Sequence, residues 1–146
     1  MSISVEVDPA FSGLNQTRVQ NIINTVFEKE GYIADTVDLV FGNDKLLNDL
    51  KKEFFKKDQL TDVIAFRLND YEEKTVEGEI YISIPRAQEN ANSYNEPFAK
   101  EIGRLIIHGS LHLLNFDDQT SVEKANMTRK EDEYLKICNW ENLNSE

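Results

Sequence analysis

The chain contains two histidines, His108 and His112, and both lie in the apolar stretch "LIIHGSLHLL". Residues four apart lie on one face of an α-helix, so the two imidazole rings can point at a common ligand. This is the helical H-x-x-x-H spacing with which zinc enzymes hold their metal. The alternative is a pair of core histidines that hydrogen bonds satisfy. The pair alone leaves both alternatives open.

A catalytic zinc usually takes three protein ligands, so a third must come from outside this helix. Asn115 follows the apolar run and tolerates the left-handed conformation in which many helices end. The chain can then reverse and return Asp118, whose carboxylate is an acceptable zinc ligand. His108, His112 and Asp118 thus form a candidate metal site. Asp117 is the competing carboxylate and fits instead an N-cap or a partner of a ligand.

Gly109, the residue after His108, bears on the chemistry of this site. Zinc proteases of the H-E-x-x-H type carry a glutamate there as general base. A glycine cannot do this, so peptide hydrolysis by that route is not expected. Gly109 and Ser110 are small, which lets another element, such as a strand, approach the helix closely.

The elements that must position these residues follow from hydrophobic periodicity. Asn15 is a candidate N-cap and Gly31 a candidate stop for the first helix. Residues 61–68 are β-branched and apolar, which predicts a central strand, and residues 71–79 are expected as a turn. The other strands are expected over residues 3–8, 36–42 and 79–84. Helices are expected over residues 16–30, 44–55, 85–94, 96–114 and 121–143, the last as a solvated cover.

Strands and helices interleave without strict βαβ repetition. We therefore predict an α+β fold in which residues 1–146 form a single domain. It would have a small mixed four-stranded sheet with helices packed on it, and the metal site would lie at the end of the long central helix over residues 96–114.

The net charge, the length of the apolar runs and the cysteine count exclude several classes of protein. A net charge of −11 argues against holding nucleic acid by non-specific electrostatics, although a local basic patch still allows an RNA substrate. No apolar run is long enough to span a bilayer, and the N-terminus lacks the pattern of a signal peptide. Cys138 is the chain's one cysteine, so no intrachain disulfide forms. These features favour a cytoplasmic protein without a membrane partner.

Four stretches together resemble one known family. "HGSLHLLNFDD" resembles the H-G-x-L-H-L-x-G-Y-D-H motif of the YbeY family, bacterial metal-dependent endoribonucleases of rRNA maturation. "TDVIAF" resembles the family strand T-D-V-L-S-F, and "GEIYISIPRAQENA" its G-D-I-x-I-S strand with the following helix. "MTRKEDEYL" resembles the M-x-x-x-E-x-x-x-L helix near the C-terminus. The resemblance covers most of the chain in the right order.

The resemblance implies a single-strand-specific, metal-dependent endoribonuclease that acts in 16S rRNA 3′-end maturation and ribosome quality control. It implies one Zn²⁺ or similar divalent metal held by His108, His112 and Asp118, which act in catalysis through metal-activated water. The implied partners are rRNA and the small ribosomal subunit with its proteins, with no DNA. Thr61 and Asp62 would frame the metal cleft.

Two departures from the family pattern concern the chemistry. Asp118 stands where the family usually has histidine, so a hard oxygen replaces a nitrogen ligand. Phe54-Phe55 stands where the family commonly has Y-R, whose arginine is thought to assist RNA cleavage. Arg67, Arg86 and Arg104 are candidate substitutes. Arg104 lies one turn before His108 and can reach either a phosphate or a neighbouring acid such as Glu101.

A lysine run around Phe54-Phe55 is the candidate RNA contact, because cations can hold phosphates while aromatic rings stack on bases. The run comprises Lys51, Lys52, Lys56 and Lys57. Arg86, further along the chain, is another candidate RNA contact. The alternative is a solvated helix face. Two other functions remain open: a non-catalytic, metal-stabilised adaptor that associates with the ribosome, and a different metal hydrolase.

Overall fold

Four strands form one mixed sheet in the computed structural model, which describes residues 2–11 and 13–144. The sheet order is β1-β2-β4-β3. β1 and β2 pair in parallel, as do β2 and β4, whereas β3 and β4 form an antiparallel hairpin. The strands are β1 (Ser2–Val7), β2 (Ile33–Gly42), β3 (Val63–Arg67) and β4 (Thr75–Ser83).

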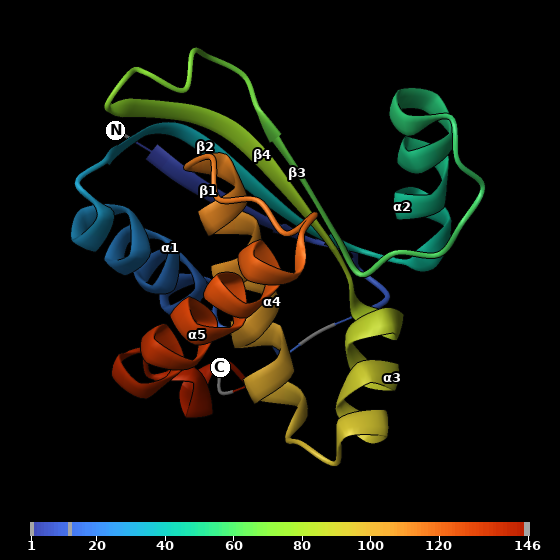
Figure 1. Cartoon of the computed structure of the whole chain (residues 1–146). Coiled ribbons are helices and arrows are strands. Elements are labelled where there is room, and N and C mark those ends of the chain that lie inside the picture. The colour runs from blue at the N-terminus through green and yellow to red at the C-terminus, as the bar shows by residue number, and fades with distance from the viewer. Residues whose placement is uncertain (1, 12, 145–146) are drawn as a thin grey trace.

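Helices cover this sheet unevenly (Figure 1). α1, α4 and α5 gather on one side of it, while α2 stands on the other side of β3 and β4, and α3 leads away from the end of β4. α4 is the central helix and packs against α1, α3, α5, β3 and β4. The bounds are α1 (Gln16–Glu30), α2 (Asp44–Leu50), the π-helical turn η1 (Lys51–Phe55), α3 (Ile84–Tyr94), α4 (Phe98–Leu113), α5 (Ser121–Ile137) and the 3₁₀ turn η2 (Trp140–Asn142). The predicted α+β class with a mixed four-stranded sheet is confirmed.

The first helix begins and ends where the sequence predicts. The Asn15 side chain accepts a hydrogen bond from the Arg18 amide at 3.1 Å, and Gly31 ends the helix with a φ of 88°. A positive φ strains residues that carry a Cβ atom, which explains the glycine. The apolar face of α1 is buried against the core, through Val19, Ile22, Ile23, Val26 and Phe27.

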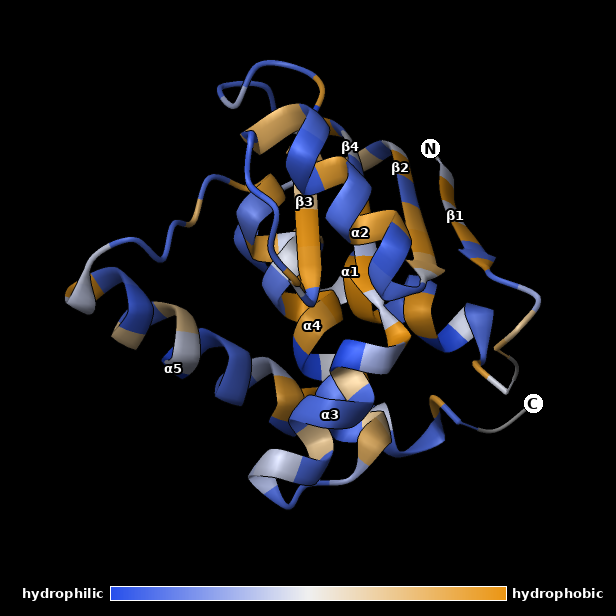
Figure 2. Ribbon diagram, turned by 90° about the vertical axis from the view of Figure 1, so that its right-hand side faces the viewer, coloured by the Kyte–Doolittle hydropathy of each residue, from blue (hydrophilic) through white to orange (hydrophobic). Residues whose placement is uncertain are grey.

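α4 lies in the middle of the core, as its apolar stretch in Figure 2 shows. Its approach to the sheet depends on Gly109: a Cβ atom there would lie 2.7 Å from Cγ2 of Ile80 on β4. Real Cβ atoms essentially never come that close, and Ile80 is fully buried. The small residue beside His108 therefore lets the helix contact the sheet, as predicted.

The prediction of a central strand over residues 61–68 is wrong, because β3 is an edge strand. Its apolar character has another cause, since both of its faces are covered. Val63 and Ala65 pack against the core, and the ring of Phe66 lies 5.2 Å from that of Phe54 and 6.0 Å from that of Phe55. An edge strand covered on both faces has the composition of a central one.

Several element boundaries also differ from the prediction, among them the start of β2, which lies at Ile33 rather than at residue 36. β4 begins at Thr75, so part of the predicted turn over residues 71–79 is strand; its buried positions Val76 and Gly78 alternate with acidic ones. The helix predicted over residues 44–55 is α-helical only to Leu50. α5 ends at Ile137.

The C-terminal helix is more than the predicted solvated cover. α5 buries Met127, Tyr134 and Leu135 and also the carboxylate of Glu131. Among the helices within the described ranges, none has the length and apolarity that a bilayer crossing requires.

Candidate metal centre

The last turns of α4 bring the two histidines together. His108 Nε2 and His112 Nε2 lie 2.9 Å apart. Both side chains are partly accessible, with exposed fractions of 20% and 27%. The histidines therefore face an opening rather than the closed core, which favours the metal-site alternative over buried structural histidines.

The chain reverses after α4 through a Schellman turn. Asn115 has a φ of 74°, its amide donates to the His112 carbonyl at 3.1 Å, and the Phe116 amide donates to the Leu111 carbonyl at 3.1 Å. These are the two hydrogen bonds that define this helix ending. The predicted left-handed role of Asn115 is therefore present in the structure, and the turn directs the chain back toward the histidines.

Asp118 is the carboxylate that returns. Its Oδ2 lies 3.5 Å from His108 Nε2 and 3.7 Å from His112 Nε2. Asp117 instead accepts a hydrogen bond from the Asp118 amide at 2.8 Å. The N-cap of α5 is Thr120, so Asp117 does not cap that helix.

These three residues fit a metal ion. One ligand atom from each of His108, His112 and Asp118 lies within 4.8 Å of the others. Zinc bonds of about 2.0–2.1 Å in a tetrahedral site place ligand atoms about 3.3–3.4 Å apart. The two histidine–aspartate distances are close to this value, and the two imidazoles need to separate by only about 0.4 Å, a side-chain rotation.

A buried carboxylate supports the site from α5. Glu131 Oε2 lies 2.7 Å from His108 Nδ1, and Glu131 Oε1 accepts a hydrogen bond from Arg104 Nη1 at 3.1 Å. Arg104 also contacts Asp132 at 3.3 Å and Glu101 at 3.8 Å. Of the two alternatives for Arg104, the structure thus shows the pairing with acids.

The pKa values of the two histidines are shifted in opposite directions. Burial disfavours the charged form of His108, but the hydrogen bond and charge of Glu131 outweigh it, so the pKa of His108 is raised. For His112, burial and the nearby His108 lower the pKa. Burial also raises the pKa of Glu101, against the opposing effects of Asn90 and Arg104.

Two adjoining cavities meet at the candidate metal site. Both are lined by His108, Asp118 and Asp62. One, of about 300 Å³, lies among α3, α4 and α5. The other, of about 370 Å³, lies beside β3. Besides the shared residues, the first is lined by Asn90, Tyr94, Arg104, Lys124 and Glu131, among others, and the second by Lys51, Phe55, Thr61, Tyr71 and His112, among others.

Comparison with known proteins agrees with this geometry. The sequence profile of the family described as Endoribonuclease YbeY matches residues 6–139. The chain belongs to the YbeY family. An Endoribonuclease YbeY of Chloroherpeton thalassium is 37% identical over 122 residues, which cover 84% of this chain and 85% of the relative. One from Flavobacterium psychrophilum is 34% identical over 137 residues, 94% of this chain and 95% of the relative.

A solved structure shares the fold. The solution structure of TM1509 from Thermotoga maritima matches with a TM-score of 0.64 and 27% identity, over 92% of this chain and 87% of that one. The YbeY family is metal-dependent, and His108, His112 and Asp118 form a group that can bind a metal ion here.

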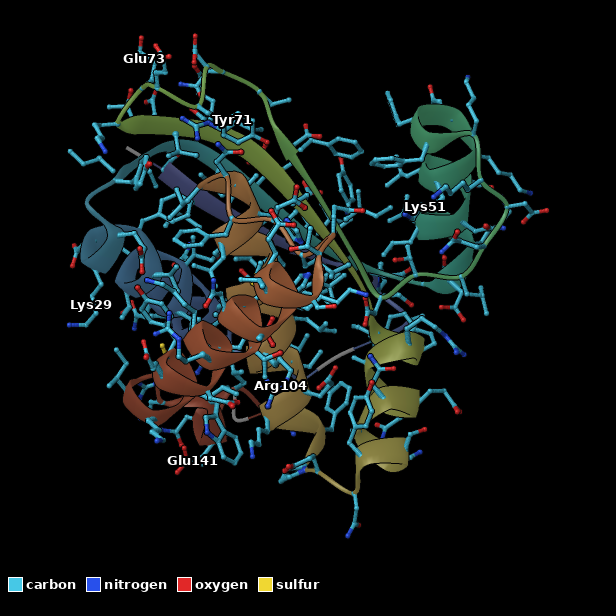
Figure 3. All side chains as sticks on the ribbon, in the orientation of Figure 1. Lys29, Lys51, Tyr71, Glu73, Arg104 and Glu141 are labelled. Atoms are coloured by element: carbon cyan, nitrogen blue, oxygen red, sulfur yellow. The ribbon has the colours of Figure 1, made fainter. Side chains whose placement is uncertain are left out.

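The basic residues predicted to contact RNA differ in whether they line a cavity at the metal site. Lys51 lines the cavity beside β3, whereas Lys52, Lys56 and Lys57 are exposed on the surrounding segment. Figure 3 shows Lys51, Tyr71 and Arg104 projecting from three different parts of the fold. Thr61 and Asp62 both line the cavity beside β3, as the YbeY resemblance implies.

The two other arginines are engaged elsewhere. Arg86 Nε lies 3.2 Å from Asp44 Oδ1, at the start of α3. Arg67 Nη1 donates to the Leu113 carbonyl at 2.7 Å, and its Nη2 donates to two further backbone carbonyls. Arg67 therefore ties the end of α4 to the hairpin of β3 and β4.

Sequence reasoning missed the supporting residues Glu131 and Asn90. A signal for Glu131 was present: Met127, Glu131 and Leu135 are spaced by four, so they share one helix face. Met127 and Leu135 are apolar and buried, so an acid between them had to be buried and paired. No comparable pattern marked Asn90, which donates to Asp62 at 2.9 Å and to Glu101 at 3.1 Å.

Proposed function

We propose that this chain is a single-strand-specific, metal-dependent endoribonuclease acting in 16S rRNA 3′-end maturation and ribosome quality control. Its relatives are named Endoribonuclease YbeY, and their similarity extends over most of the chain. The observation that carries the proposal is the convergence of His108, His112 and Asp118 at the junction of two open cavities. We propose these three residues as the metal ligands, with Zn²⁺ or a similar divalent ion as the metal.

A divalent metal held there supplies Lewis-acid activation of water and of a phosphoryl oxygen. The chain itself must hold the RNA around the scissile phosphate. Phe55 and Tyr71, exposed by 43% and 44%, line the cavity beside β3; Lys51 Nζ lies 4.7 Å from the centre of the Phe55 ring, and Arg67 Cζ lies 5.2 Å from that of the Tyr71 ring. Stacking on such rings requires unpaired bases, which supports a single-stranded substrate.

Cations near the site support phosphate binding. Lys51 lines one cavity and Lys124 the other, so a strand crossing the metal site meets a positive charge on each side. An exposed segment after Lys51 carries Lys52, Lys56 and Lys57. These lysines stay predicted contacts to the flanking RNA. Arg86 also stays a predicted contact, and its use requires release from Asp44.

Arg104 lines the cavity among α3, α4 and α5 and stays a predicted contributor to catalysis. Its guanidinium already contacts Glu131 and Asp132, so a direct phosphate contact has to compete with those pairs.

The experiment combines metal analysis with RNA cleavage on the same protein samples. Wild type is compared with His112→Ala and Asp118→Asn, and Asp117→Asn is the matched control because the amide oxygen still accepts from the next backbone amide. The substrate is a single-stranded RNA with the sequence of the 16S rRNA 3′ region, and a duplex of the same sequence tests strand specificity.

We expect bound metal and cleavage in wild type and in Asp117→Asn, and loss of both in the two ligand variants. Metal binding without turnover by nuclease-free protein would support the ribosome-associated adaptor instead. Absence of metal in wild type, even after reconstitution, would refute the metal centre. Binding to isolated small subunits tests the proposed partners, which the cleavage assay does not address.

A further inference from the structure

The side chain of Glu131 is buried, which is energetically unfavourable for a carboxylate. It is 6% exposed, on a helix whose neighbouring acids face the solvent. Burying a charged group is strongly unfavourable unless partners satisfy it. Both carboxylate oxygens have such partners, His108 on one side and Arg104 on the other.

We propose that Glu131 is a positioning residue of the metal centre. Its Oε2 accepts the Nδ1–H of His108, and this contact fixes both the tautomer and the orientation of the ring. A neutral imidazole carries one N–H, so a proton held on Nδ1 leaves the lone pair on Nε2. Nε2 is the atom that faces His112 and Asp118. The inference rests on the proposed function, because it presupposes that these residues hold a metal.

The arrangement matches how proteins commonly support metal-binding histidines. The second ring nitrogen usually donates to a carboxylate, which orients the ligand and increases its basicity. The 2.7 Å separation of Glu131 from Nδ1 is that of a strong, charge-assisted hydrogen bond. Asp118 does not need a supporting carboxylate of this kind, because the turn at Asn115 determines its position.

Contacts of α5 with α1 and with the core fix the position of Glu131. Lys130 Nζ lies 2.8 Å from Glu30 Oε2 on α1, and the Tyr134 hydroxyl donates to the same carboxylate. Met127 and Leu135, one turn on either side of Glu131, are buried. The packing of α5 against the rest of the core therefore determines where His108 can point.

Arg104 belongs to the same arrangement. Its Nη1 binds Glu131 Oε1 and Asp132, and its Nε lies 3.8 Å from the buried carboxylate of Glu101. Glu101 in turn accepts from Asn90. Arg104 thus fixes the position of the Glu131 carboxylate, and it acts on the metal centre through Glu131. This assigns Arg104 a role that requires no contact with a phosphate.

The test measures metal affinity, which does not depend on RNA cleavage. Metal-free wild type, Glu131→Gln and Glu131→Ala are titrated with Zn²⁺ against a chelator of known affinity, and the Co²⁺ absorption spectrum reports ligand geometry. Glu133→Gln is the matched control, because it makes the same change on the same helix at an exposed residue paired with Arg129. Circular dichroism and thermal unfolding in EDTA verify the fold.

We expect zinc affinity to fall about 10–100-fold in both Glu131 variants, while the control remains like wild type. In ¹H–¹⁵N spectra of the zinc-loaded wild type, His108 should carry its proton on Nδ1. Arg104→Gln, which leaves His108 untouched, should weaken zinc binding by a smaller factor. This second variant keeps the test decisive even if both Glu131 variants fail to fold.

A purely structural role predicts a lower melting temperature with unchanged zinc affinity, and that result would overturn the inference. So would a wild-type zinc affinity in folded Glu131→Gln. If wild type itself binds no zinc, the proposed metal centre fails, and the positioning role fails with it. The wild-type titration therefore separates failure of the function from failure of the inference.

Discussion

Asn115 offers a quantitative test of how the fold returns Asp118 to the histidines. Its φ of 74° lies in the left-handed region, and its side chain is exposed. A substitution there therefore acts chiefly through the backbone. We consider the series Asn115→Gly, Asn115→Ala and Asn115→Val, in which the tolerance of a positive φ falls stepwise.

The left-handed conformation costs an ordinary L-residue about 1–2 kcal/mol, and asparagine less. Glycine removes that strain but loses about 0.4–1 kcal/mol through the greater freedom of the unfolded chain. Asn115→Gly should thus be nearly neutral, whereas Asn115→Val should lose about 1–2 kcal/mol of folding free energy, with Asn115→Ala between them. For a chain of this size, that loss corresponds to a drop of about 3–7 °C in melting temperature for the valine variant.

The assay is thermal unfolding of the metal-free proteins, followed by zinc titration. Because the same turn returns Asp118, zinc affinity should follow the same order, with glycine near wild type and valine weakest. Asn115→Gly is the internal control, since it removes the same side chain without demanding a negative φ. If glycine lowered the melting temperature as much as valine does, backbone conformation would not be the reason for asparagine here.

Other properties of the site lead to three further predictions. Gly109→Ala should cost a net of about 1 kcal/mol in urea unfolding, because overpacking of about 1–3 kcal/mol exceeds the gain of about 1 kcal/mol in helix propensity; increased stability would contradict the close contact with β4. In metal-free protein, NMR titration should give His108 a pKa above 6.5, since Glu131 outweighs burial, and His112 a pKa below it; the reverse order would contradict the geometry. Lys51→Gln should make the salt dependence of single-stranded RNA binding shallower by about 0.7 in log–log slope, and an unchanged slope would remove Lys51 from the phosphate path.

The local chemistry of the site could be read from the sequence because each part has a short-range signal. The four-residue histidine spacing is a property of one helix, and the left-handed turn at Asn115 is a property of one residue. Together they suffice to predict that Asp118 returns, as the structure shows. The caps of α1 were predictable for the same reason.

What the sequence did not reveal depends on contacts between distant segments. β3 has the composition of a central strand, and only the packing of Phe54 and Phe55 over Phe66 explains this composition at an edge. The pairing of Glu131 with His108 joins residues 23 positions apart on two helices. No local rule specifies which acid of an acidic helix turns inward, apart from its buried neighbours one turn away.

The net charge of −11 is compatible with an RNA substrate because three of the acids around the site are paired, buried or placed to bind a cation. Glu131 is paired with Arg104, burial raises the pKa of Glu101, and Asp118 is the group that would offset a bound cation. A bound divalent ion and Lys51 then determine the potential that a phosphate meets locally. The acidic remainder of the surface repels RNA elsewhere, so binding has to rely on contacts that only the two cavities at the metal site provide. Base stacking is such a contact, and duplex RNA cannot make it because its ring faces are already stacked.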